Sequence, residues 1–297
     1  MIKNFFDEHN INYKEEISLK NYNTYKIDTK CKFLVYPKNE SELITIIKKI
    51  KELQYKYFIL GNGSNIIFSM DYYDGIIIKL DKLNEVKYCQ NKIIVGAGCL
   101  LSKIALETVE KGYSGLVFAT GIPGTVGAST AMNAGAYKSD MSAVVESVRV
   151  LNEKNEIITL SNKELSYKYR DSYLKKHKNL IVLATTFKLT KDESIEDMKR
   201  QIEERRQKRI ATQPLSEPNA GSVFRNPDNM YAGELIEKSN LKGRNINGAE
   251  ISNKHANFII NKGGATGKDI IALIKEAQKE VKEKYNIELK LEQIIVE

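Results

Sequence analysis

The first third of the chain alternates between short apolar runs and one amphipathic segment. Residues 32–37 and 55–60 predict strands, because apolar and β-branched side chains cluster there between polar ones. Residues 39–53 predict a helix, with Asn39 and Glu42 spaced as a capping box. The apolar residues of this segment share one helical face: Leu43, Ile46, Ile47, Ile50 and Leu53.

The same pattern continues through the rest of the chain. A second amphipathic segment, residues 100–112, predicts a helix that ends at Gly112. Apolar runs predict strands over residues 75–80, 91–98, 145–152, 155–160, 180–189, 256–263 and 287–297. Further helices are expected at 193–210, 230–239 and 266–284, the last with Thr266 and Asp269 as its capping box. We therefore expect an α+β protein.

The segment 193–210 is much more highly charged than its neighbours. Its few apolar residues lie on one face, and Arg205 and Arg209 continue that stripe. A charged helix of this kind suits a bridge between domains. We therefore expect one domain over residues 1–192, with two subdomains divided near residue 68, and a second over residues 193–297.

Composition narrows the class of protein. Hydrophobic residues make up 42% of the 297, and no apolar run approaches the roughly 18 that a membrane span needs. The first ten residues lack the apolar core of a signal peptide, and Cys31, Cys89 and Cys99 form no CxxC pair. We therefore expect a cytoplasmic protein without membrane insertion or disulfides. His9, His177 and His255 are not spaced as metal ligands, so no metal is expected.

The net charge of +8 raises the question of a polyanionic partner. Lysines are spread along the chain among acidic residues, and the one dense basic cluster, 199–209, includes two glutamates and no aromatic residue. This pattern disfavours nucleic acid, although a non-catalytic nucleic-acid-binding protein stays an alternative. A basic pocket for one phosphorylated small molecule fits the same charge.

Two glycine-rich stretches have the character of phosphate-binding loops. The first follows the strand at 55–60 and consists of Gly61, Asn62, Gly63, Ser64 and Asn65. Its glycines allow successive N–H groups to point inward as an anion nest. The alternative is a simple turn between two strands. A Rossmann fingerprint is disfavoured, because Ile66 stands where the third glycine belongs.

The second stretch, TGIPGTVGAS, lies in a region without lysine. The residues expected to contact a cofactor here are Gly121, Ile122, Gly124, Thr125 and Gly127. The small residues that follow favour a helix whose first amides face a phosphate. The alternative is a tight structural crossing. Two such loops about sixty residues apart favour one dinucleotide bound by both.

The stretch PNAGSVFRNP, residues 218–227, reads as a loop around Ser222. Ser222 is either a turn residue or a hydroxyl held in place for proton transfer. His255 is expected to be a hydrogen-bonded structural residue rather than a base.

Seven stretches in this order resemble the UDP-N-acetylenolpyruvoylglucosamine reductase (MurB) family of peptidoglycan synthesis. They are GNGSN, GIPGTVGA, MNAGAY, YRDSYL, QPLSEPNAGSVFRNP, KHANFIIN and LEQIIV. The resemblance extends from about Ser18 to Val296 and lacks the extra tyrosine-bearing loop of longer members. It implies a FAD-binding domain of the vanillyl-alcohol-oxidase/PCMH type over 1–192 and an α+β substrate-binding domain over 193–297. Non-covalent FAD, NADPH as hydride donor, and a monomer are further expectations.

The reaction implied by the resemblance has two halves. NADPH reduces the flavin, and flavin N5 then delivers hydride to C3 of the enolpyruvyl sugar nucleotide while a proton reaches C2, giving UDP-N-acetylmuramate. The resemblance makes Ser222 the general acid, Arg170 the group that binds the substrate carboxylate, and Glu292 a hydrogen-bond partner of the enol form. It also assigns substrate contacts to Arg209 and Asn226. Another FAD-dependent oxidoreductase of the same fold is the alternative within this class.

The chain departs from the family pattern at several positions. Asp28 and Thr29 stand where Gly-Gly is usual, Asn62 where glycine is frequent, and Ala128 in place of a second glycine after Gly127. None of these departures removes a residue that the resemblance makes catalytic.

Overall fold

The helices expected from the apolar pattern are present in a computed structural model, which describes residues 1–191 and 194–297. Helix α2, Glu40–Glu52, begins after Asn39, whose side chain accepts a hydrogen bond from the Glu42 N–H. The Glu42 carboxylate accepts from the Lys38 N–H, one residue before the position that a full capping box would use. Only one of the two hydrogen bonds of the predicted capping box is therefore formed. The inner face of α2 is buried.

Helix α8, Gly267–Tyr285, carries the complete capping box expected from the sequence. The Asp269 N–H donates to Thr266 Oγ1 at 3.2 Å, and the Thr266 N–H donates to Asp269 Oδ2 at 2.8 Å. Helix α3, Leu101–Glu110, and helix α6, Ile195–Thr212, match the other two long amphipathic or charged segments. Among the described residues, no helix has both the length and the hydropathy needed to cross a membrane.

The chain divides into two compact units that interleave along the sequence. Unit 1 comprises Met1–Glu15, Phe33–Asn62 and Asp74–Glu204, and unit 2 comprises Glu16–Lys32, Gly63–Tyr73 and Arg205–Glu297. The domains expected from the sequence were two continuous stretches, and their boundary at 192–193 lies outside the described residues. Segment 63–73 belongs with unit 2 through the pairing of residues 66–68 with 294–296, and segment 16–32 through hydrogen bonds of Tyr25 to Asn261 and Gln293. Composition does not reveal such non-local contacts.

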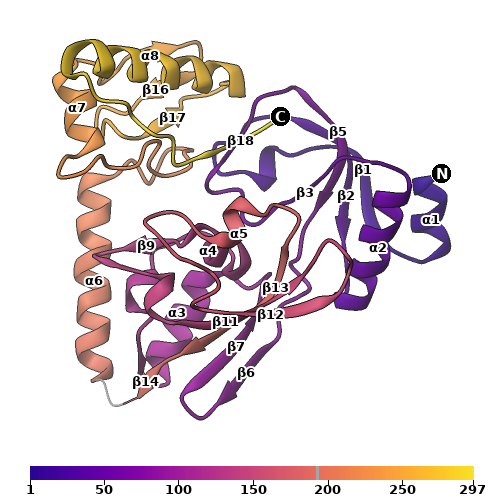
Figure 1. Ribbon diagram of the computed structural model, residues 1–297. Helices are drawn as coiled ribbons and strands as arrows, with labels where there is room; N and C mark the ends of the chain where they lie inside the picture. The colour runs from indigo at the N-terminus through magenta and orange to yellow at the C-terminus, as the bar shows by residue number, and fades with distance from the viewer. Residues whose placement is uncertain (192–193) are drawn as a thin grey trace. The chain divides into compact units, whose positions relative to one another are not determined.

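Unit 1 contains one antiparallel sheet and most of a second sheet (Figure 1). Residues of both sheets contribute to one hydrophobic core. The antiparallel sheet has the order β12-β11-β13-β7-β6. Its strands are Ile157–Ser161, Val145–Leu151, Ile181–Lys188, Lys92–Gly96 and Val86–Cys89. The other sheet has the order β1-β2-β5-β3, and β3 pairs in parallel with β5. Its strands are Asn12–Ser18, Lys30–Tyr36, Tyr72–Ile78 and Tyr57–Ile59.

Short elements complete unit 1. Helix α1, Ile2–Glu8, which the sequence pattern did not reveal, buries Ile2 and Phe6 in the shared core. Helix α4, Val126–Met132, packs against β13. The remaining elements are β8 Tyr113–Ser114, η2 Val117–Ala119, β9 Gly135–Ala136, β10 Ser139–Asp140, η3 Met141–Ala143, α5 Tyr173–Lys176 and β14 Thr190–Lys191.

Unit 2 has its own core beneath α7, Ala232–Lys238, and α8. Its antiparallel sheet has the order β15-β16-β17, with strands Asn245–Ile246, Ala249–Ile251 and Ile259–Asn261. Strand β18, Ile294–Val296, pairs in parallel with β4, Ile66–Phe68, and η1, Lys20–Tyr22, belongs to the same unit.

The last strand was expected over residues 287–297 but covers only Ile294–Val296. The preceding residues change partner: Lys290 and Glu292 bond to the backbone of Arg225 and Val223, and Ile294 then bonds to Asn65. Two successive partners on a short segment prevent one continuous ladder. The change of partner places the Ser222 loop and residues 290–292 next to each other within unit 2.

Candidate active site

The first glycine loop, residues 61–65, connects β3 to β4. Gly63 has a φ of +65°, and a Cβ there would lie 2.2 Å from the Tyr22 carbonyl oxygen. A Cβ on Gly61 would lie 2.9 Å from Thr125 Oγ1. Both positions therefore require glycine, Gly63 for backbone conformation and close approach, and Gly61 for contact with the second loop.

The backbone N–H groups of this loop are candidates for binding a ligand. Within the described parts of the chain, none of the five N–H groups from Gly61 to Asn65 donates a hydrogen bond to the protein. A run of unclaimed amides is the arrangement that binds phosphate oxygens in backbone nests. The loop therefore fits the pyrophosphate of a dinucleotide such as FAD.

The second glycine loop, 121–127, offers fewer amides. The Val126 and Gly127 N–H groups donate to the carbonyls of Cys99 and Ala97, at 2.8 and 3.0 Å. A Cβ on Gly127 would lie 2.8 Å from the Ala97 Cβ, so this glycine permits close packing. Ile122 N–H donates to the Ala119 carbonyl. In the described chain, the Gly124 and Thr125 N–H groups make no such bond.

The structure brings the two loops together. Asn62 Nδ2 donates to the Pro123 carbonyl at 2.6 Å, in addition to the contact between Gly61 and Thr125. The two loops, about sixty residues apart in the sequence, therefore contact each other, and their common binding of one dinucleotide stays a prediction. Asn62, which departs from the family pattern, forms one of the links.

Lys79 is a neighbour of these loops that the sequence analysis missed. Its ammonium group donates to the Gly61 carbonyl at 2.7 Å and lies 3.2 Å from Asp81 Oδ1, while the residue is 7% exposed. A buried lysine is unusual and normally has a specific partner. The sequence feature that could have indicated this buried lysine is its position directly after the run GIII, at the end of a strand.

Ser222 lies in a loop of unit 2 whose neighbouring residues are held by hydrogen bonds. Gly221 has a φ of +75°, and its N–H donates to Asn219 Oδ1 at 2.9 Å. Val223 N–H donates to the Asn257 carbonyl at 2.9 Å. Ser222 itself is half-buried, and its hydroxyl has no hydrogen-bond partner among the described residues. The hydroxyl is therefore available to a substrate.

Glu292 lies beside this loop in the same unit. Its N–H donates to the Val223 carbonyl at 2.8 Å, and Leu291 forms an antiparallel bridge with Phe224. The Glu292 carbonyl accepts a 3.3 Å hydrogen bond from Asn65 Nδ2. Ser222 and Glu292, seventy positions apart in the sequence, are thus on neighbouring backbone segments of unit 2, and Asn65 of the same unit bonds to the second segment.

Arg170 belongs to unit 1 and has a φ of +54°, which only glycine adopts at low cost. Its guanidinium donates to the Gly135 carbonyl at 2.6 Å and lies 5.2 Å from the centre of the Tyr169 ring. Lys175 donates to the Arg170 carbonyl at 3.0 Å. Several contacts thus hold the backbone and the side chain of Arg170 in place.

The two predicted substrate contacts are in different settings. Arg209 lies on α6, where its Nε donates to Gln213 Oε1 at 3.2 Å. Asn226 is exposed, and its Oδ1 accepts from the Ala232 N–H at the start of α7. Both belong to unit 2, with Ser222 and Glu292.

His255 is half-buried, and partial burial lowers the pKa of its ring below the ordinary value. Its Nδ1 accepts from the Asn257 N–H at 3.2 Å, and the ring packs against Phe258. A neutral, hydrogen-bonded ring suits the structural role expected for it. Among the described residues, no group of three or more His, Cys, Asp or Glu is placed to hold a metal.

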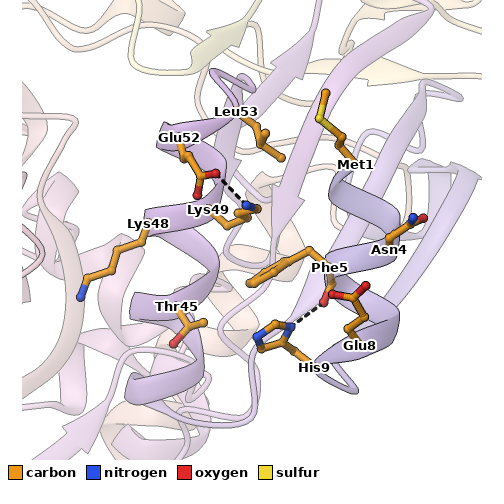
Figure 2. A pocket seen from close by; sticks show the side chains of 10 residues that line it. All are labelled: Met1, Asn4, Phe5, Glu8, His9, Thr45, Lys48, Lys49, Glu52 and Leu53. Atoms are coloured by element: carbon orange, nitrogen blue, oxygen red, sulfur yellow. Dashed lines mark hydrogen bonds and ion pairs between the residues drawn. The ribbon is translucent and has the colours of Figure 1, made fainter.

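Two hollows among the described residues are lined by side chains other than the predicted site residues. One open hollow of about 650 Å³ lies between α1 and α2 of unit 1 (Figure 2). It is lined by Met1, Asn4, Phe5, Glu8, His9, Thr45, Lys48, Lys49, Glu52 and Leu53. It contains none of the predicted site residues, so the loop chemistry described above is the better guide to function.

Two family models match the chain. The model described as FAD binding domain matches residues 31–161, and that described as the C-terminal domain of UDP-N-acetylenolpyruvoylglucosamine reductase matches residues 213–296. Together with the mixed helices and strands, they confirm the expected fold class, an FAD-binding domain followed by an α+β C-terminal domain. The first match includes both glycine loops, and the second includes Ser222 and Glu292.

Similar proteins match more than nine-tenths of the chain. UDP-N-acetylenolpyruvoylglucosamine reductase from Clostridium novyi (strain NT) is 41% identical over 95% of this chain and 92% of its own length. The enzyme from Caldanaerobacter subterraneus subsp. tengcongensis is 44% identical over 91% of this chain and 89% of its own. The crystal structure of UDP-N-acetylenolpyruvylglucosamine reductase (MurB) from Thermus caldophilus matches with a TM-score of 0.81 and 30% identity, covering 97% of this chain and 99% of that one. The chain therefore belongs to the UDP-N-acetylenolpyruvoylglucosamine reductase family.

Proposed function

We propose that this protein reduces UDP-N-acetylglucosamine enolpyruvate to UDP-N-acetylmuramate, with FAD as cofactor and NADPH as electron donor, in the synthesis of peptidoglycan precursors. Full-length similarity to reductases of this name supports the reaction. The single observation that carries the chemistry is the pairing of the Ser222 loop with the Glu292 segment, beside an otherwise unpartnered hydroxyl.

The two glycine loops would hold the FAD diphosphate without a covalent bond. The N–H groups of Gly61 to Asn65 supply most of the donors, and those of Gly124 and Thr125 add two more. When bound, FAD supplies the chemistry of accepting a hydride from NADPH and passing it to the substrate. Lys79 fixes the Gly61 carbonyl and so holds the first loop in position.

Ser222 would donate the proton that C2 of the enolpyruvyl group needs. A serine hydroxyl is a weak acid, so it acts only when it is held within hydrogen-bond reach of the acceptor and its anion is stabilised. The hydrogen bonds of the neighbouring Gly221 and Val223 N–H groups support the first requirement, because they hold the backbone on both sides of Ser222. Glu292, on the adjacent segment, would hydrogen-bond the enol form of the substrate.

Arg170 would bind the substrate carboxylate and stabilise the negative charge that develops there. A guanidinium offers five donors in a planar fork, which suits a carboxylate. Its contact with the Gly135 carbonyl sets the orientation of the side chain. Arg209 and Asn226 would contact the nucleotide part of the substrate, with Arg209 reaching a phosphate.

The two parts of the chain would bind different molecules. Residues 1–192 would bind FAD, and residues 193–297 would bind the UDP-sugar. A small-molecule substrate accounts for the positive charge without a nucleic-acid partner. We propose a monomer that works in the cytoplasm, where UDP-linked sugar precursors are made.

The test separates the two half-reactions under anaerobic conditions. NADPH should bleach the flavin absorbance of the purified protein, and the enolpyruvyl sugar nucleotide should restore it, whereas UDP-N-acetylglucosamine should not. Ser222→Ala should be reduced by NADPH at the wild-type rate and reoxidised by substrate about 100-fold to 10,000-fold more slowly, the usual contribution of a general acid. Equal reoxidation rates would remove Ser222 from the mechanism. Reoxidation by unrelated acceptors alone would favour a different flavin oxidoreductase.

A further inference from the structure

The loop around Ser222 is held by buried side-chain amides on both sides of the serine. Asn219 caps the Gly221 N–H on the near side. Two further amides, Asn257 and Gln293, are almost completely buried, at 4% and 3% exposed. All of these residues belong to unit 2. The side chain between them, Ser222, is the one left without a partner in the part of the loop that the structure describes.

Asn257 holds the residues that follow Ser222. Its Oδ1 accepts from the Phe224 N–H at 2.9 Å, and its Nδ2 donates to the Phe224 carbonyl at 2.8 Å. Its own backbone carbonyl accepts from the Val223 N–H at 2.9 Å. Asn257 therefore makes three hydrogen bonds to the consecutive residues Val223 and Phe224, which fix the position and orientation of the backbone there.

Gln293 holds the residues that precede Ser222. Its Nε2 donates to the carbonyls of Ala220 and Gly221, at 3.1 and 3.2 Å. Its Oε1 accepts from the hydroxyl of Tyr25 at 3.0 Å. Burial raises the pKa of the Tyr25 phenol above its ordinary value, so this hydroxyl stays a donor. A donor aimed at Oε1 forces the amide to present its NH₂ group to the loop.

We propose that Asn257 and Gln293 are positioning residues for proton transfer, which hold the backbone on either side of Ser222 so that its hydroxyl has one fixed location. The inference rests on the proposed function of Ser222. Because Gln293 directly follows Glu292 in the chain, the same amide also ties the Ser222 loop to the segment that carries Glu292. The backbone segments that carry the two predicted catalytic residues are thereby tied to each other.

A purely structural role would also explain buried amides, so the two roles must be separated by their effects. An amide that merely supports the fold affects folding stability and both half-reactions alike. A positioning amide affects the step that uses Ser222 and leaves flavin reduction by NADPH unchanged. A displacement of about 1 Å at a reacting group costs about 100-fold in rate, whereas the fold tolerates it.

The test compares two variants that both carry Tyr25→Phe, one with Gln293 and one with Gln293→Leu. Replacing Gln293 alone would leave the buried Tyr25 hydroxyl without an acceptor, which destabilises the protein for an unrelated reason. The double variant Tyr25→Phe with Gln293→Leu removes both polar partners and the two bonds to the loop. Gln278→Leu is the matched control, because Gln278 makes a similar amide bond in unit 2, to the Leu289 carbonyl at 2.9 Å.

The double variant should reoxidise with the enolpyruvyl substrate about tenfold to 100-fold more slowly than Tyr25→Phe. Flavin reduction by NADPH should agree within about twofold, and thermal unfolding should shift no more than in Gln278→Leu. Hydrogen–deuterium exchange of the peptide 219–225 should be faster than in Tyr25→Phe. Asn257→Asp, which keeps the acceptor for the Phe224 N–H and loses the donor, should slow the same half-reaction about tenfold.

An unchanged reoxidation rate in the double variant would overturn the role of Gln293, and an unchanged rate in Asn257→Asp would overturn that of Asn257. Equal slowing of both half-reactions would show a structural role and also overturn the proposal. If the wild-type protein itself is not reoxidised by the enolpyruvyl substrate, the proposed function fails instead, and this outcome appears before any variant is compared.

Discussion

The two glycine loops looked alike in the sequence, but their backbone N–H groups differ in the hydrogen bonds they make within the protein. Loop 61–65 makes no backbone N–H bond to the described protein, whereas loop 121–127 commits two amides to the carbonyls of Cys99 and Ala97. In the first loop, Gly63 has a positive φ, while Gly127 in the second is needed for tight packing on Ala97. A glycine-rich sequence therefore does not by itself tell a ligand cradle from a crossing of two backbones.

The comparison refines an alternative left open by the sequence. For the first loop, the alternative was a plain turn, and its unclaimed amides favour a phosphate nest instead. For the second loop, the alternative was a structural crossing. The hydrogen bonds of the Val126 and Gly127 N–H groups to Cys99 and Ala97 favour this alternative for that part of the loop. We infer that most of the affinity for the FAD diphosphate comes from the first loop.

The largest effect is expected for Gly63→Ala. An alanine there would have a φ of +65° and a Cβ 2.2 Å from the Tyr22 carbonyl, so the loop must move. Losing one or two phosphate hydrogen bonds, at about 1.5–3 kcal/mol each, should weaken FAD binding by about 100-fold. The measurement is a titration of flavin-free protein with FAD by fluorescence. Wild-type affinity in this variant would show that the first loop does not bind the cofactor.

A smaller effect is expected for Lys79→Met, which keeps most of the buried stem and removes the ammonium group. The Gly61 carbonyl loses a 2.7 Å hydrogen bond, and the first loop becomes less well held. We expect FAD affinity to fall about fivefold, as for the loss of about 1 kcal/mol. Lys82→Met, at an exposed lysine nearby in sequence, is the control. If the two variants bind FAD equally, Lys79 has no part in ordering the loop.

Local patterns in the sequence predicted much of the fold. Capping residues located α2 and α8, and spacing of apolar residues located α3, because these signals depend on neighbours within a few positions. The short last strand and the segments 16–32 and 63–73 of unit 2 were not foreseen. They depend on pairings such as β4 with β18, between residues more than two hundred positions apart. No local pattern records such a partner.

The candidate site was predictable to a similar extent. The resemblance to a family pointed to Ser222 and Glu292, which the structure places on adjacent segments. The supporting residues were missed: Lys79 beside the first glycine loop, and Asn257 and Gln293 beside the Ser222 loop. A buried polar side chain looks like a surface one in a sequence. The partners of these three side chains are mostly backbone carbonyls and amides, which every residue possesses. Only coordinates reveal which of these groups a side chain reaches.

The smallest change in FAD binding is expected for Gly127→Ala, and this variant tests the comparison most directly. Its N–H is already bonded to the Ala97 carbonyl, so little phosphate binding is at stake. An added Cβ would lie 2.8 Å from the Ala97 Cβ, and relieving this overpacking should cost about 1–3 kcal/mol of folding stability. FAD affinity of the folded protein should fall only about threefold, as for the loss of a fraction of 1.4 kcal/mol. The two quantities are measured separately, by denaturant unfolding of the flavin-free protein and by FAD titration. A loss of affinity as large as that of Gly63→Ala, with stability intact, would mean that both loops bind the diphosphate equally and that the bonds to Cys99 and Ala97 do not separate them.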